Sequence, residues 1–235
     1  MQRNGGSSRY DMDAFPPPSA DGGRSASKAI VKITFHFAAL HYLNLWLSSE
    51  RAIHDAISTG NKDRQLNALH KGATHFRIAR NLHTVYDIGR GLPRYGPILD
   101  IIAPLTGQDF DDDLTGTTIK IRDQISSLYG NRDVLSATTK ILWLKMRSPI
   151  IIYDSQARKA LRTKEGDLSA FNHAWKAKYE SVREHIADAC SRLATVLEYT
   201  ADTSVATTAY VQSMANEEWF NQRVLDIYLW HVGTK

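Results

Sequence analysis

From Ser25 onward, apolar residues recur with the three-to-four-residue spacing of amphipathic helices, and alternating, strand-like stretches are almost absent. This periodicity predicts an all-α protein. Gly, Pro, Asn and Asp separate the helical runs, as is typical of helix ends. No internal repeat of about 20 to 50 residues is present, which argues against a helical solenoid. The helices are expected over residues 26–48, 49–59, 62–88, 95–104, 115–129, 136–147, 155–163, 168–199 and 215–231.

Residues 1–24 differ from the rest of the chain in composition. They hold Gly-Gly-Ser-Ser, three consecutive prolines and Asp-Gly-Gly, with few large apolar residues. Such a segment cannot bury enough apolar surface to offset its ordering entropy, so we predict a disordered N-terminal tail. It also lacks the charged and apolar regions of a signal peptide. The length of the chain then suits a single all-helical domain over residues 25–235.

The composition narrows the classes of protein. No run of about 18 apolar residues predicts a membrane span. Cys190 is the only cysteine, which excludes an intrachain disulfide and a four-cysteine cluster and favours a cytoplasmic location. The histidines lack metal-ligand spacing, and no glycine-rich phosphate-binding motif is present. We therefore expect no metal and no organic cofactor.

The net charge of +4 is unevenly distributed along the chain. Residues 70–94 carry five Lys or Arg against one Asp, and residues 140–164 carry seven against one Asp. A phosphate backbone would be attracted to such stretches, although basic runs are often only solvated faces. The distribution makes DNA a candidate partner, and the sequence gives no indication of a protein partner.

A helix, a turn and a second helix are predicted at the start of the second basic stretch. Gly130 and its neighbours Asn131 and Asp133 predict the end of one helix, and Ser136 is a natural N-cap for the next. Lys140 would then lie in the first turn of that second helix. There the positive end of the helix dipole disfavours an ammonium, which would make the lysine amine a better nucleophile.

The chain can return from the end of this helix to its start. Ser148-Pro149 breaks the helix, and residues 150–153 are an extended, mostly β-branched run long enough to cover the way back. Asp154 would therefore lie beside Lys140 and would cap the helix that begins at Ser155. The simpler interpretation is that Asp154 is only an N-cap and Lys140 only a solvated side chain.

The stretch from Tyr129 to Leu161 resembles helix-hairpin-helix DNA glycosylases, particularly short bacterial proteins similar to 8-oxoguanine DNA glycosylase. In that family a lysine at the start of the second hairpin helix precedes, after a proline-containing return, a catalytic aspartate. Lys140 matches the nucleophilic lysine and Asp154 the aspartate. The resemblance implies a DNA N-glycosylase, with possible β-lyase activity, that excises an 8-oxoguanine-like purine through a lysine Schiff base. Residues 134–139 lack the Gly-x-Gly that the family carries ahead of the lysine. Lys145, further along the same helix, is the alternative candidate for the nucleophile.

Further residues are candidates for nucleic-acid contacts. Arg77 and Arg80 would share one face of the helix expected over residues 62–88, and a solvated face is the simpler interpretation of that pair. The full set of candidate contacts is Arg77, Arg80, Arg90, Arg94, Ser136 and Thr139. The recurring aromatic residues are expected to be core, and Arg223 and Asp226 to form an ion pair on the flank of the last helix.

A competing hypothesis is a non-catalytic helical protein that binds nucleic acid or a protein partner. It would have kept the scaffold and lost the hairpin glycines. The resemblance includes short bacterial relatives in phage-defence gene clusters, so such an accessory protein could belong to a defence system.

Overall fold

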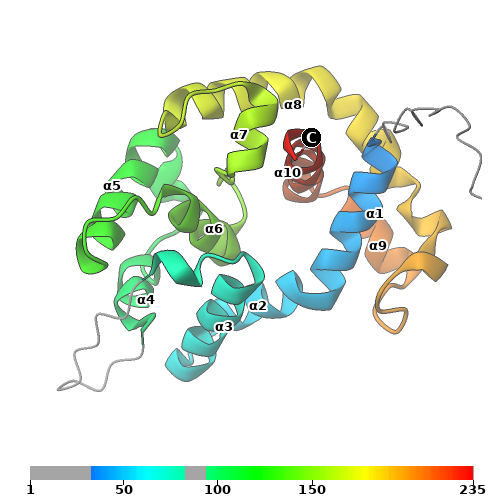
Figure 1. Cartoon of the computed structure of the whole chain (residues 1–235). Helices are drawn as coiled ribbons and strands as arrows, with labels where there is room; N and C mark the ends of the chain where they lie inside the picture. The colour runs from blue at the N-terminus through cyan, green and yellow to red at the C-terminus, as the bar shows by residue number, and fades with distance from the viewer. Residues whose placement is uncertain (1–32, 83–93, 235) are drawn as a thin grey trace, which may run out of the picture. The chain divides into compact units, whose positions relative to one another are not determined.

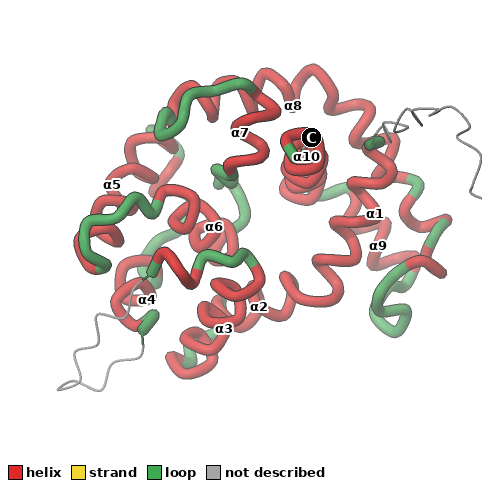
Figure 2. Tube along the Cα trace, viewed as in Figure 1, coloured by secondary structure: helices red, strands yellow, loops and turns green. Residues whose placement is uncertain are grey.

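A computed structural model describes residues 33–82 and 94–234 of the chain, and every regular element in these two ranges is a helix (Figure 1, Figure 2). The all-α class expected from the apolar spacing is confirmed. Ile33–Lys235 forms one compact unit. The tail expected over residues 1–24 lies outside the described residues.

The described part of the chain begins with a capped helix. Thr34 caps the first helix by accepting a hydrogen bond from the backbone N–H of Phe37 at 3.1 Å. The elements longer than four residues in the described ranges are α1 (Phe35–Leu45), a π-helical turn (Trp46–Glu50), α2 (Arg51–Ile57), α3 (Lys62–His75), α4 (Gly96–Ile102), α5 (Leu114–Leu128), α6 (Leu135–Met146), α7 (Ser155–Leu161), α8 (Leu168–Ser191), α9 (Thr208–Ala215) and α10 (Glu218–Gly233).

Helix α6 is buried on nearly every side. Residues 137–144 are all buried, including the polar Thr138, Thr139 and Lys140. It packs against α5, α2 and α3. A helix that is apolar almost all round belongs in a protein interior, so α6 holds its few polar side chains in a setting that water barely reaches.

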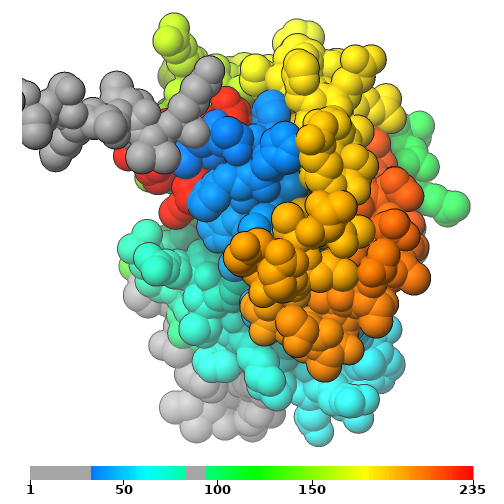
Figure 3. Space-filling model, turned by 90° about the vertical axis from the view of Figure 1, so that its right-hand side faces the viewer, coloured from blue at the N-terminus to red at the C-terminus, as the bar shows by residue number. Residues whose placement is uncertain are grey.

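Helix α10 is the second interior helix and packs against α7, α1 and α8. Its last residue, Gly233, lies against the backbone of Gln156 in α7, where a Cβ atom would overlap the Gln156 carbonyl. In the space-filling view, α1 and α9 lie on one face together with part of α8 (Figure 3). Helices α6, α7 and α10 therefore bring the residues of the 140–154 segment and the C-terminal helix together.

The expected helix over residues 62–88 is too long, because α3 ends at His75. Arg77 adopts a positive φ of 55°, and the backbone N–H of Ile78 donates to the carbonyl of Ala73 at 2.9 Å. This is the geometry of a Schellman C-cap, with buried Ile78 as the apolar residue that follows it. Arg80 lies in a separate 3-10 turn, so the expectation that Arg77 and Arg80 share a helix face was wrong.

The C-terminal boundaries also differ from those expected. The helix expected over residues 168–199 ends at Ser191 and is followed by two short 3-10 turns. Helix α9 was not expected at all. It has only eight residues, is capped by Thr207, and buries Val211, Met214 and Ala215. So short a helix leaves little periodic signal, and its stability comes from packing against its neighbours.

Candidate functional site

The hairpin that carries Lys140 forms as the sequence predicted. Helix α5 ends in a tight turn in which Gly130 has a φ of 79° and the Asn131 N–H donates to the Ser126 carbonyl at 2.9 Å. Helix α6 begins at Leu135, one residue earlier than expected, with Val134 at the N-cap. Ser136 is therefore not the cap, and Lys140 lies in the second turn of α6 and not in the first.

The return segment is fixed to α6 by a hydrogen bond. After Arg147 ends the helix with a φ of 62°, residues 150–153 run back as a buried, extended segment. The backbone N–H of Tyr153 donates to the Thr139 hydroxyl at 3.0 Å. Because Asp154 is the next residue along the chain, this bond places its carboxylate beside the side chain of Lys140.

Lys140 and Asp154 form an ion pair, as the geometric argument predicted. The Lys140 Nζ donates to Asp154 Oδ2 at 2.9 Å and to the Ser136 hydroxyl at 3.1 Å. The lysine side chain is 11% exposed and the aspartate 20%. Asp154 also caps α7, since its Oδ1 accepts from the Gln156 N–H at 2.8 Å. The pair is thus partly buried and held at both ends.

The surroundings of Asp154 keep its carboxylate ionised. Burial opposes ionisation, but the Lys140 ammonium, the Gln156 N–H and Arg223 together outweigh it and lower the pKa of Asp154. Asp154 is therefore a fixed negative charge that accepts hydrogen bonds. Such a group stabilises a neighbouring positive charge better than it stores a proton.

A second cluster of charged side chains, which sequence reasoning missed, is centred on Arg223 of α10. Its Nη2 lies 3.2 Å from Glu50 Oε1, and its Nη1 lies 3.5 Å from Asp226 Oδ2. His75 Nε2 reaches the same Glu50 oxygen at 3.1 Å. The Glu50 side chain is fully buried and that of Arg223 is 7% exposed. The expected Arg223–Asp226 pair is present, but it is buried and not on the flank of the helix.

Aromatic rings enclose the Arg223 guanidinium. Its central carbon lies 5.1 Å from the centroid of the Trp143 ring and 5.6 Å from those of Tyr42 and Phe76. The ring faces attract a desolvated cation. The carboxylates of Glu50 and Asp226 and the hydroxyl group of Tyr42 raise the pKa of Arg223 despite its burial, so this side chain is a permanent positive charge in the interior.

The two carboxylates near Arg223 ionise differently. Burial raises the pKa of Glu50, but Arg223 and His75 outweigh it and the net direction is down. Burial raises the pKa of Asp226 to about 7, and the charge of Asp154 adds to the rise, while Arg223 at 3.5 Å and the hydrogen bond from Trp175 offset only part of it. The Trp175 indole N–H donates to Asp226 Oδ1 at 2.8 Å.

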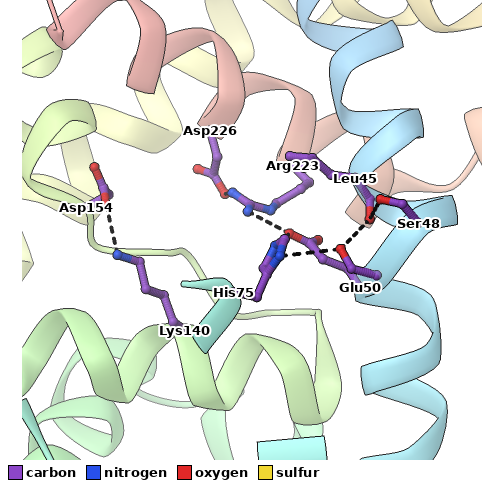
Figure 4. A network of polar contacts seen from close by, with 9 residues as sticks. Leu45, Ser48, Glu50, His75, Lys140, Asp154, Arg223 and Asp226 are labelled. Carbon is purple, nitrogen blue, oxygen red and sulfur yellow. Dashed lines mark hydrogen bonds and ion pairs between the residues drawn. The ribbon is translucent and has the colours of Figure 1, made fainter. Parts of the chain in front are cut away.

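The Lys140–Asp154 pair and the Arg223 group lie in the same interior region (Figure 4). Asp226 and Arg223 project from α10 toward Glu50, which follows α1, while Lys140 rises from α6. Arg223 lowers the pKa of Asp154, and Asp154 raises that of Asp226, so the two groups interact electrostatically. In the sequence, the only signal was the Arg223–Asp226 spacing; Glu50 and His75 gave none.

The residues expected to contact nucleic acid do not form one common surface among the described residues. Thr139 is buried, and its hydroxyl is occupied by the Tyr153 N–H, so it offers no surface for DNA. Arg94 donates to the carbonyls of Ala79 and Leu82, so this end of its guanidinium is occupied by the backbone of the chain. Arg77 and Arg80 are exposed, on different elements. Ser136 is half-buried and accepts from Lys140. Arg90 lies outside the described residues.

Comparisons of the chain with protein-family models, with curated proteins and with solved structures gave no match. Within residues 33–82 and 94–234, no cluster of three or more His, Cys, Asp or Glu is placed to hold a metal ion. No helix in the described part of the chain combines the length and apolar character needed to cross a membrane. The arguments about function therefore rest on the site itself.

Proposed function

We propose that this chain is a helix-hairpin-helix-like DNA N-glycosylase with lyase activity that removes a damaged or modified purine through Lys140. The observation that carries the proposal is the contact between the Lys140 amine and the Asp154 carboxylate at 2.9 Å. Lys140 lies on α6, and Asp154 directly follows the return segment, where it also caps α7. A hydrogen bond from the Tyr153 N–H to the Thr139 hydroxyl fixes the return segment, so the contact between Lys140 and Asp154 is held in place by the fold.

The proposed reaction uses the lysine nitrogen as the nucleophile. The Lys140 ammonium first gives one proton to the base, and the free amine nitrogen then bonds to C1′ of the target nucleotide as the N-glycosidic bond breaks and its electron pair leaves with the base. A second proton passes from the nitrogen to O4′ as the C1′–O4′ bond opens, which leaves a protonated Schiff base between the sugar and the lysine. Asp154 remains ionised and stabilises the positive charge that develops on the sugar.

Arg223 and its partners stabilise the ionised form of Asp154 in this arrangement. The guanidinium is buried and positively charged, and it contributes to the ionised state of Asp154. A carboxylate held ionised in a partly buried site interacts more strongly with a developing charge than it would in water. The Arg223 group is therefore a positioning element for Asp154 in the proposed mechanism, and it does not touch the substrate.

Borohydride trapping tests the proposal. The protein is incubated with duplex DNA that contains 8-oxoguanine or an abasic site, and the Schiff base is reduced to a stable adduct. We expect an adduct with the wild type and with Lys145→Gln, and none with Lys140→Gln. Lys145 is the matched control because it lies on the same helix and is half-buried. The absence of an adduct on either substrate, or its loss in Lys145→Gln alone, would contradict the proposal.

One observation favours the non-catalytic alternative. The start of α6, where the resembled family carries glycines that approach phosphate, is buried at Leu135 and Ala137, and Leu135 N–H is already bound by Asp133 at 3.0 Å. A helical scaffold that no longer uses this hairpin to hold DNA against Lys140 would show this, and it would bind a partner through another surface. DNA binding without a borohydride adduct on any damaged substrate would favour it.

A further inference from the structure

A groove of about 760 Å³ runs between α2 and α3, away from the Lys140–Asp154 pair. One wall is made of small side chains from the π-helical turn and α2, chiefly Ser49, Ala52 and Ala56. The other wall is the polar face of α3, which presents Arg64 and Lys71. The opposite face of α3 packs into the core, so a volume typical of small-molecule sites is left open between two adjoining helices.

The groove is lined by cationic side chains and by no carboxylate among the described residues. Arg64 and Lys71 are exposed, and neither forms an ion pair within the described parts of the chain. They are seven residues apart on one helix, which separates them by about 10 Å. By contrast, Lys62 on the same helix is paired with Asp100 at 3.5 Å. Two unpaired cations on one wall favour an anionic ligand with more than one charge.

Ser48 and Ser49, which line the groove, belong to an unusual backbone turn. The π-helical turn Trp46–Glu50 leaves the Leu45 carbonyl to accept from the Ser48 and Ser49 hydroxyls at 3.4 and 3.0 Å. Isolated π-helical turns occur frequently at functional sites. The same turn buries Glu50 fully, with one carboxylate oxygen lacking a hydrogen-bond partner among the described residues.

His75 also lines the groove, and its ring lies between Ser49 and the buried Glu50. Its Nδ1 lies 3.4 Å from the Ser49 hydroxyl and its Nε2 lies 3.1 Å from Glu50. The negative charge of Glu50 is therefore behind an imidazole and is paired with Arg223. An anion in the groove would meet the imidazole and two hydroxyl groups before any carboxylate.

We propose that the groove between α2 and α3 is a second ligand site, for a nucleoside phosphate, which goes beyond the proposed lysine chemistry. Arg64 and Lys71 bind the phosphate oxygens, and the apolar wall of Ala52, Ile53 and Ala56 contacts the base. The planar, forked guanidinium suits a phosphate, and the methyl groups of alanine leave room for a flat ring. The nucleotide can be free or can belong to a nucleic-acid strand.

Equilibrium binding distinguishes these sources. ATP and a 5′-phosphorylated single-stranded oligonucleotide are titrated separately into the full chain, and binding is followed by calorimetry and by fluorescence anisotropy. Arg64→Glu and Lys71→Glu are each expected to weaken binding about tenfold or more, since each removes a charge-assisted contact. Lys62→Glu, on the same helix but paired outside the groove, is the matched control and should stay within about twofold of the wild type.

Each outcome decides between the possibilities. ATP binding that depends on Arg64 and Lys71 supports a free nucleotide, and the same dependence for the oligonucleotide alone assigns the groove to a nucleic-acid strand. No saturable binding of either probe, or an equal loss in Lys62→Glu, overturns the site. Far-UV circular dichroism checks that the variants are folded. The titrations are repeated in Lys140→Gln, so that failure of the lysine chemistry leaves this result unaffected.

Discussion

Replacement of Arg223 by Met is expected to destabilise the protein strongly. The change removes the only cation within 3.5 Å of both Glu50 and Asp226 in the described structure, and it leaves a fully buried, ionised Glu50 carboxylate with His75 as its remaining partner. Loss of one partner from a buried pair costs about 3–5 kcal/mol, and the three aromatic rings around the guanidinium lose a cation. We expect a loss of about 4 kcal/mol.

Urea unfolding at pH 7, followed by tryptophan fluorescence, measures this loss. With a denaturant slope of about 2 kcal/mol per M, the midpoint should fall by about 2 M. The double variant Arg223→Met with Glu50→Gln should be less destabilised than Arg223→Met alone, because it no longer buries an unpaired charge.

An exposed ion pair provides the matched control. Arg183 lies 3.3 Å from Glu218, and both side chains are about half exposed. Arg183→Met should therefore cost no more than about 1 kcal/mol. If Arg223→Met costs as little as Arg183→Met, or if the double variant is less stable than the single one, the interior group is not the coupled unit described above.

Three further results are expected. Because the pKa of Asp226 is raised to about 7, its protonated form contributes stability that is complete below about pH 4 and is lost as the pH rises through 7. Asp226→Asn should remove this loss, and parallel pH profiles of the urea midpoint for the variant and the wild type would contradict the prediction. Gly233→Ala should lower the free energy of unfolding by about 1–3 kcal/mol, because the new Cβ overlaps the Gln156 carbonyl. Gly60 faces open space, so Gly60→Ala should lower it far less, and equal thermal midpoints of the two variants would refute the packing argument. Asp154→Asn keeps an oxygen that can cap α7 but loses the charge, so initial rates of borohydride trapping should fall roughly 100-fold, and an unchanged rate would remove Asp154 from the mechanism. The thermal midpoint should fall as well, because the partly buried Lys140 loses its charged partner, so the rates are compared at a temperature at which the variant is folded.

Local sequence signals predicted the parts of the site that local structure makes. The hairpin followed from Gly130 and Asn131, both of which have positive φ, and the cap of α7 followed from Asp154. The approach of Asp154 to Lys140 could be argued from the length of the return alone, because a short extended segment after a helix has few ways to run. Boundaries were weaker: the start of α6 moved by one residue and put Lys140 in the second turn.

The group around Arg223 could not be found in this way. Glu50 and Arg223 are 173 positions apart, and no local pattern links a glutamate in a π-helical turn to an arginine in the last helix. Thr139 shows the same limit, since a hydroxyl near a helix start is typical of a surface contact. The return segment covers it, and it accepts the Tyr153 N–H instead.

By itself, the sequence determined the all-α class, the hairpin and the pairing of Lys140 with Asp154, because apolar periodicity, helix ends and short connections act between near neighbours. Only the tertiary structure decided that α6 and α10 are interior helices, that Asp154 shares its surroundings with Arg223 and Asp226, and that a groove lies between α2 and α3. The physical reason is that burial and the strength of a charge depend on what distant segments bring into contact. The residues next to a side chain in the sequence do not determine which distant residues will bury it.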